Sequence, residues 1–63
     1  MKLGKKNIAI LGSTGSIGVQ ALEVVSGLNK YFNVCVITTN NNADLVIKQA
    51  IKFLPDYVVI VLL

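Results

Sequence analysis

Three short runs of apolar residues, separated by two stretches with helical spacing, organise this chain. The runs cover Asn7–Leu11, Val34–Thr38 and Tyr57–Leu62, and β-branched residues are frequent in them. Continuous runs of this length and composition are typical of parallel strands buried on both faces. The pattern therefore predicts the order strand, helix, strand, helix, strand.

The two intervening stretches repeat apolar residues every three or four positions, as one face of a helix does. In the first helix, expected from Ser16 to Leu28, the face to be buried comprises Ile17, Ala21, Val24, Val25 and Leu28. In the second helix the corresponding face comprises Ala43, Val46, Ile47, Ala50, Ile51 and Leu54. Asn42 can cap the second helix, and Pro55 helps to end it because proline cannot continue a helix.

Strands that alternate with helices form a parallel sheet with right-handed crossovers. The predicted fold class is therefore α/β, with residues 1–63 forming the first half (β-α-β-α-β) of a Rossmann-like doubly wound sheet, an incomplete domain. The chain has 63 residues and is 54% hydrophobic, whereas a free-standing domain this small normally exposes more polar surface. We expect the apolar excess to be covered by further strands and helices of a larger domain. The single cysteine, Cys35, excludes an internal disulfide and is expected to be a small buried hydrophobe within a strand.

Three glycines at regular spacing, Gly12, Gly15 and Gly18, follow the first apolar run. Gly12 lets the backbone leave the strand, Gly15 lets a pyrophosphate approach the main chain, and Gly18 lets the helix pack close to the sheet. A strand, a glycine turn and a helix in this order are typical of a dinucleotide site, where N–H groups at the helix N-terminus bind phosphate. Further candidate donors to the phosphate oxygens are the hydroxyls of Ser13, Thr14 and Ser16.

The spacing G-x-x-G-x-x-G excludes a Walker-type phosphate loop, because no Gly-Lys-Ser/Thr follows at the required distance. A turn between strand and helix also needs glycine for backbone reasons alone. A turn that binds nothing is therefore the alternative interpretation.

The second strand ends without the Asp or Glu that usually binds the ribose 2′-hydroxyl of NAD. The residues at this end are Thr38, Thr39, Asn40, Asn41 and Asn42. Without a carboxylate to repel a 2′-phosphate, NADP is the favoured cofactor, although no Arg or Lys stands in the loop to pair that phosphate. An ordinary asparagine-rich turn is the alternative, since asparagine tolerates turn conformations well.

The net charge of +3 does not predict a nucleic-acid partner, because the lysines form no single patch and no aromatic residues are interleaved with them. The apolar runs are too short for a signal peptide or a membrane helix. We expect no membrane partner, no targeting segment, and a cytoplasmic location in a bacterium or a plastid-type compartment. The only acids are Glu23, Asp44 and Asp56, which predict neither a metal site nor a general base.

Gly12–Gly18 with the sequence GSTGSIG, followed by ALEVV at residues 21–25, resembles the N-terminus of the 1-deoxy-D-xylulose 5-phosphate reductoisomerase family. Later segments agree with it: FNV at residues 32–34 before the second strand, Asn42, and FLPDYVV at residues 53–59 before the third. The resemblance runs from about Lys6 to Ile60, and the GSTGSIG string is far more specific than the glycine spacing alone.

The resemblance implies an NADPH-dependent oxidoreductase that converts 1-deoxy-D-xylulose 5-phosphate to 2-C-methyl-D-erythritol 4-phosphate in non-mevalonate isoprenoid biosynthesis. It also implies a divalent metal (Mg or Mn), a phosphosugar substrate and a homodimer in the full-length enzyme. The resemblance places Thr14, Gly15, Ser16 and Ile17 at the pyrophosphate of the cofactor and Asn42 beside the adenosine ribose. With the glycine turn and the asparagine loop, the expected cofactor-binding residues are Gly12, Ser13, Thr14, Gly15, Ser16, Ile17, Asn40, Asn41 and Asn42.

The chain departs from the family pattern in two places. The family often has Gly-Lys-Asn or Gly-Arg-Asn where this chain has Asn40, Asn41 and Asn42, and it turns polar where this chain ends in Val61, Leu62 and Leu63. The catalytic and metal-binding residues of the family belong to later segments, so these 63 residues alone are not expected to be active. Two alternatives stay open: a fragment of another NADP-dependent oxidoreductase, such as a semialdehyde dehydrogenase or an extended short-chain reductase, and a non-catalytic remnant.

Overall fold

The computed structural model describes residues 4–61 and contains three strands and two helices in the predicted order. The elements are β1 (Lys6–Ile10), α1 (Ser16–Gly27), β2 (Phe32–Asn40), α2 (Ala43–Phe53) and β3 (Tyr57–Val61). The second strand is longer at both ends than the apolar run predicted, since it includes Phe32, Asn33, Thr39 and Asn40. Of the third predicted strand, Leu62 lies outside the described residues.

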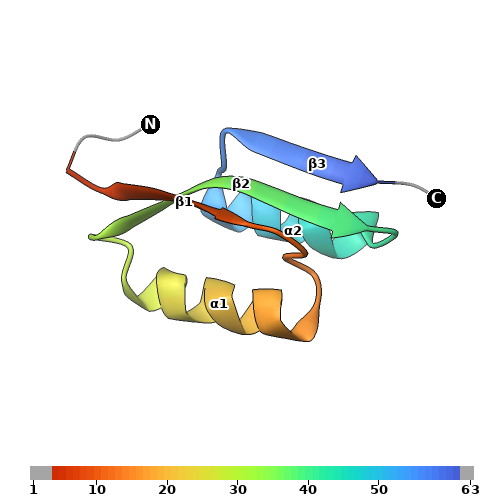
Figure 1. The fold of residues 1–63 in the computed structure, drawn as a ribbon, viewed down its shortest axis with the longest axis horizontal. Coiled ribbons are helices and arrows are strands. Elements are labelled where there is room, and N and C mark those ends of the chain that lie inside the picture. Colours follow the sequence, from red (N-terminus) through yellow and green to blue (C-terminus); the bar gives the residue numbers. More distant parts are fainter. Residues whose placement is uncertain (1–3, 62–63) are drawn as a thin grey trace.

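The strands form one parallel sheet in the order β1-β2-β3. Both helices lie on the same face of this sheet (Figure 1), as expected when two crossovers of the same hand advance in the same direction. The fold class is confirmed: the chain forms a partial Rossmann-like β-α-β-α-β unit.

A bulge in β2 changes which residues face the helices. Ile8 pairs with Val34, but the next residue, Ala9, pairs with Val36, so Cys35 is the extra residue. An extra residue reverses the in-and-out alternation of a strand. Val34 and Ile37 are therefore both buried against the helices although they are three positions apart.

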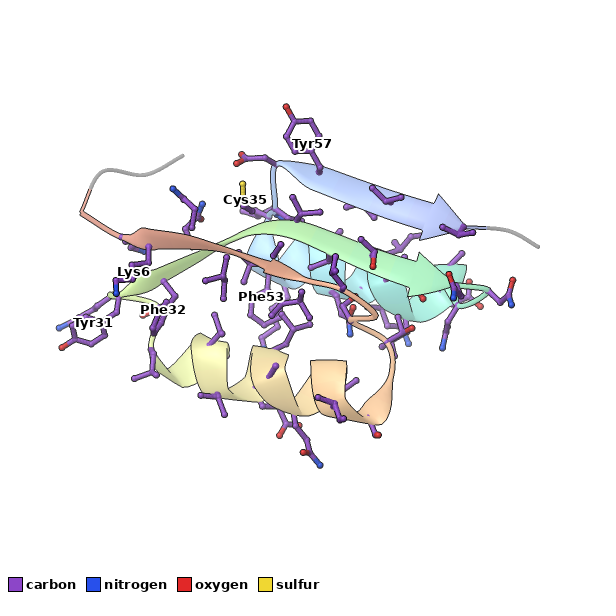
Figure 2. All side chains as sticks on the ribbon, viewed as in Figure 1. Lys6, Tyr31, Phe32, Cys35, Phe53 and Tyr57 are labelled. Atoms are coloured by element: carbon purple, nitrogen blue, oxygen red, sulfur yellow. The ribbon has the colours of Figure 1, made fainter. Side chains whose placement is uncertain are left out.

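The core is small and lies between the sheet and the two helices. Its buried apolar members are Leu22, Val34, Ile37 and Val46. Partly buried residues packed around them are Ile8, Ile10, Val25, Ala50 and Phe53, and Figure 2 shows Phe53 between the sheet and the helices.

The prediction that the strands are buried on both faces is wrong for the described residues. Every residue of β3 is exposed. This strand lies at the edge of the sheet, the helices cover it only in part, and nothing within residues 4–61 covers its other face. Cys35 is likewise only half-buried, and it points to the open face together with Tyr57 (Figure 2). Its thiol donates a hydrogen bond to Asp56 Oδ2 at 3.1 Å. This contact with a carboxylate raises the pKa of the Cys35 thiol.

The predicted buried faces of the helices are partly wrong. On α1 the buried positions are Gly18 and Leu22, and on α2 they are Val46 and Gln49. The predicted core residues that are exposed instead are Ile17, Val24, Leu28, Ile47, Ile51 and Leu54. Each helix thus has an apolar stripe wider than the face that the three strands cover, and the outer part of each stripe lies open.

Candidate functional site: the glycine turn and the carboxyl edge of the sheet

The turn between β1 and α1 depends on a left-handed residue and a close contact. Gly12 has φ +71°, a backbone conformation that favours glycine. The Gly15 N–H donates to the Gly12 carbonyl at 3.0 Å and closes the turn. A Cβ on Gly15 would meet only Gly12 O, at 3.4 Å, so the free protein has room for a small side chain there.

Gly18 has no such room. A Cβ on this residue would lie 2.3 Å from Gly12 O and 2.7 Å from Ser13 Cα. The close packing predicted for Gly18 is therefore against the backbone of the turn that leaves β1. A side chain at residue 18 would push α1 away from that turn.

Two threonines at the end of β2 hold the turn in place. Thr38 Oγ1 accepts a hydrogen bond from the Gly12 N–H at 2.9 Å, and the Thr38 carbonyl accepts one from the Ser13 N–H at 2.8 Å. The hydroxyls of Thr14 and Thr39 also hydrogen-bond to each other. The β1–β2 pairing thus continues past the end of β1 through backbone and side-chain hydrogen bonds, and it anchors the turn to the sheet.

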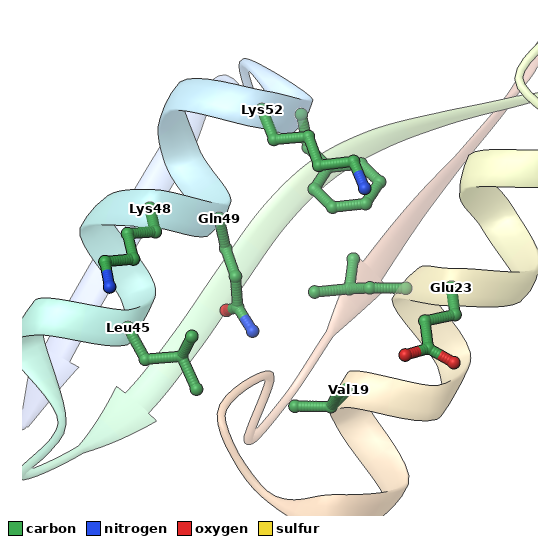
Figure 3. Close-up of a pocket in the computed structure, with 8 residues that line it drawn as sticks. Val19, Glu23, Leu45, Lys48, Gln49 and Lys52 are labelled. Atoms are coloured by element: carbon green, nitrogen blue, oxygen red, sulfur yellow. The ribbon is translucent and has the colours of Figure 1, made fainter.

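Gln49 of α2 reaches the same turn from the helix side (Figure 3). Gln49 Nε2 donates to the Ser13 carbonyl at 2.7 Å, and the Ser13 hydroxyl donates to Gln49 Oε1 at 2.7 Å. Ser13 is fully buried and Gln49 is 8% exposed. The Ser13 hydroxyl, expected to be a phosphate donor, is therefore used inside the protein, and so is its N–H.

The N-terminus of α1 keeps its backbone donors open. Gly15 is the N-cap residue, it makes no side-chain cap, and the first turn carries no acidic residue. The first N–H paired within the helix is that of Val19, which donates to Gly15 O at 2.9 Å. Within residues 4–61, the N–H groups of Ser16, Ile17, Gly18 and Thr14 have no partner.

The asparagine loop follows β2 at the same edge of the sheet. Asn40 is the last residue of β2, and Asn41 has φ +66°. The predicted cap of α2 is confirmed, because Asn42 Oδ1 accepts a hydrogen bond from the Leu45 N–H at 3.2 Å. The amide Nδ2 of Asn42 makes no hydrogen bond within the described part of the chain.

Two cavities adjoin the turn, one on each side. The first, of about 300 Å³, connects the turn to the end of β2 and is lined by Gly12, Thr14, Gly15, Thr38, Thr39 and Asn40. The second, of about 500 Å³, lies along the free edge of β1 and is lined by Ala9, Ile10, Leu11, Gly12, Gly15, Ser16, Ile17, Gly18 and Ala21. Gly12 and Gly15 line both cavities, so a ligand that crosses the turn can occupy the two together.

The structure thus brings most of the candidate residues to one edge of the sheet, and it adds Thr38, Thr39 and Gln49 as the residues that hold them. The sequence indicates the burial of Gln49 only through its position three residues after Val46, which places both residues on one face of α2.

Among residues 4–61, no group of three metal-ligating side chains occurs. Neither described helix is long and apolar enough to span a membrane.

Three parallel strands, two helices on one face and a glycine turn at the carboxyl edge define a partial Rossmann-like unit. Residues 8–62 match the family model described as 1-deoxy-D-xylulose 5-phosphate reductoisomerase. The chain belongs to this family.

Curated relatives agree with the family match. The 1-deoxy-D-xylulose 5-phosphate reductoisomerase of Bacteroides fragilis is 54% identical over 59 residues, which are 94% of this chain and 15% of the relative. That of Porphyromonas gingivalis is 55% identical over 56 residues, and that of Elusimicrobium minutum is 51% identical over 55 residues. The chain thus spans about one seventh of the length of these relatives.

Proposed function

We propose that this chain is the NADPH-binding segment of a 1-deoxy-D-xylulose 5-phosphate reductoisomerase, an oxidoreductase of the non-mevalonate route to isoprenoids. The observation that carries the proposal is the open N-terminus of α1. Four backbone N–H groups around the glycine turn have no partner within residues 4–61, and they lie at a helix end that favours anions. These groups, from Thr14, Ser16, Ile17 and Gly18, would receive the diphosphate.

The two cavities suggest how the cofactor lies. The adenosine half would occupy the cavity beside Asn40, with Asn41 and Asn42 near the ribose. The other half would cross Gly12 and Gly15 into the cavity at the free edge of β1. Gly15 suits the crossing point, because any side chain there would stand between the backbone and the diphosphate.

In this proposal the residues of the chain bind and orient the cofactor. NADPH supplies the hydride for a carbonyl reduction, and the open amides fix the position of the diphosphate. The divalent metal, the phosphosugar site, the catalytic residues and the dimer interface would belong to the remainder of the enzyme. The exposed apolar residues of β3 and the outer stripes of both helices are surfaces that such a remainder would cover. The bacterial relatives favour the cytoplasm over a plastid.

A urea melt of the chain with and without NADPH tests cofactor binding. A ligand that binds only the folded form raises the midpoint, by RT ln(1 + [L]/Kd) in free energy. We expect NADPH to raise it, and chemical-shift changes in an NMR titration to centre on the amides of Thr14, Ser16 and Ile17. If the chain is folded in the NMR spectrum and neither the midpoint nor the spectrum changes with NADPH, cofactor binding by this segment is contradicted.

A chimera tests the segment in its enzymatic context. In this chimera the present chain replaces the matching 59-residue segment of the Bacteroides fragilis reductoisomerase. We expect the chimera to reduce 1-deoxy-D-xylulose 5-phosphate with NADPH. A chimera that folds and dimerises but binds no NADPH would contradict the proposal.

A further inference from the structure

The buried pair of Ser13 and Gln49 connects α2 to the glycine turn at two atoms. Gln49 Nε2 donates to the Ser13 carbonyl and Gln49 Oε1 accepts from the Ser13 hydroxyl, each at 2.7 Å. Figure 3 shows the Gln49 side chain extending from α2 into the space between the helices. Both polar ends of this amide therefore contact one residue, and that residue lies inside the turn.

The first of these bonds determines how a peptide group is oriented. In a planar trans peptide the C=O and the N–H point in opposite directions, and the described residues contain no cis peptide bond. The Ser13 carbonyl points to Gln49, so the N–H of the same peptide group, which belongs to Thr14, points away from it. That N–H is one of the four open donors of the turn.

We infer that Gln49 is a positioning residue for cofactor binding: it holds the Ser13–Thr14 peptide so that the Thr14 N–H faces the dinucleotide diphosphate. The inference rests on the proposed function. Gln49 contacts only protein, and it acts on the cofactor through Ser13. The threonine bonds from β2 hold Gly12 and the N–H side of Ser13, whereas Gln49 is the described partner of the Ser13 carbonyl.

Two variants of Gln49 test this role in the chimera. Gln49→Leu removes both hydrogen bonds at similar size. Gln49→Glu keeps an acceptor for the Ser13 hydroxyl but, as a carboxylate, cannot donate to the Ser13 carbonyl. Both are expected to raise the KM for NADPH about tenfold, as removal of a coupled buried contact does. The kcat at saturating NADPH and the KM for the sugar phosphate should stay near those of the parent.

Ala50→Gly is the matched control. Ala50 is the next residue of α2, packs at the core and does not hydrogen-bond to the turn through its side chain. Glycine in a helix interior lowers stability, so this variant should lower the thermal midpoint and leave the KM for NADPH unchanged. The double variant Gln49→Leu, Ser13→Ala should cost less than the sum of the single variants, because both remove the same hydroxyl contact.

The outcomes separate the two proposals. A parent chimera that folds but does not bind NADPH overturns the proposed function. If the parent binds NADPH but Gln49→Leu and Gln49→Glu match Ala50→Gly in KM, the role of Gln49 is overturned and the residue only stabilises the fold. Should Gln49→Leu fail to fold, the comparison of Gln49→Glu with the control decides.

Discussion

The two helices begin at the same edge of the sheet, yet their N-termini are built differently. At α2, Asn42 accepts a hydrogen bond from the Leu45 N–H, and Asp44 places a negative charge in the first turn. At α1 the N-cap is Gly15, which has no side chain to offer, and the first turn has no acidic residue. The N–H of Gly18 corresponds to that of Leu45, and it has no partner in residues 4–61.

This difference supports the proposed diphosphate site at α1. A helix N-terminus carries a partial positive charge and open N–H groups, which a protein normally satisfies with its own side chains. At α2 a side chain caps one of these N–H groups and an acidic residue lies in the first turn, whereas within residues 4–61 no side chain caps α1, which lies next to two cavities. Ser, Asp or Asn at residue 15 would cap α1 better than glycine by only about a few tenths of a kcal/mol, and a glycine leaves the backbone free for the proposed diphosphate.

Gly18→Ala is expected to have the largest effect on stability, because its side chain would push α1 away from the turn. The new Cβ would lie 2.3 Å from Gly12 O, and a backbone atom cannot move aside as a flexible side chain can. We expect a loss of about 2 kcal/mol or more in the free energy of unfolding, measured by urea titration of the chimera.

Gly27→Ala is the control for this loss. Gly27 is also in α1, and its added Cβ would meet nothing within 4 Å. Alanine is the better helix former by up to about 1 kcal/mol, so this variant should be as stable as the parent or more so. Equal losses at residues 18 and 27 would mean that the packing of α1 against the turn is unimportant.

Gly15→Asp converts the N-terminus of α1 into one like that of α2. The backbone of Gly15 (φ −74°, ψ 167°) is already that of an N-cap residue, so aspartate fits there and supplies a cap. We expect stability to hold or to rise by a few tenths of a kcal/mol, while the carboxylate occupies the open amides and repels the diphosphate. The Kd for NADPH, measured by fluorescence titration, should rise at least about tenfold, or 1.4 kcal/mol.

Gly15→Ala separates charge from bulk in this experiment. Its Cβ reaches Gly12 O at 3.4 Å, an ordinary contact, so the fold should be kept. Its effect on NADPH should lie between those of the parent and Gly15→Asp. If Gly15→Asp binds NADPH as the parent does, the amides of α1 are not the diphosphate site.

Local features of this chain were predictable, and features that depend on distant residues were not. The order of elements follows from the apolar pattern, and the cap at Asn42 follows from residue type and position. The burial of Gln49 does not, because glutamine on a helix is usually solvated and only the approach of Ser13 satisfies both ends of its amide. The exposure of Ile17 and Ile51 is not predictable for a related reason: an apolar stripe shows that a face is to be covered but not by which element.

Asn42→Ala tests the capped N-terminus of α2. Loss of the side-chain cap should cost about 1 kcal/mol of stability, measured by thermal or urea unfolding. Asn42→Ser keeps an oxygen acceptor for the Leu45 N–H and should recover most of this loss. If the amide Nδ2 of Asn42 also contacts the cofactor ribose, Asn42→Ser will recover stability without recovering the affinity for NADPH. Recovery of both together would limit Asn42 to the role of a cap.

Asn41→Lys adds a positive charge next to the capped N-terminus of α2, in the loop that follows β2. Lysine at residue 41 would stand near the proposed adenosine ribose, where the neutral loop offers no charge to a 2′-phosphate. We expect the affinity for NADPH to rise about fivefold, or 1 kcal/mol, while that for NADH stays constant, since only NADPH carries this phosphate. The left-handed backbone of Asn41 (φ +66°) suits asparagine better than lysine, so a stability loss of about 1 kcal/mol should accompany the gain. The preference for NADPH should shrink when salt is raised, because exposed charge pairs are screened. An equal change for both nucleotides would show that the loop does not approach the 2′ position.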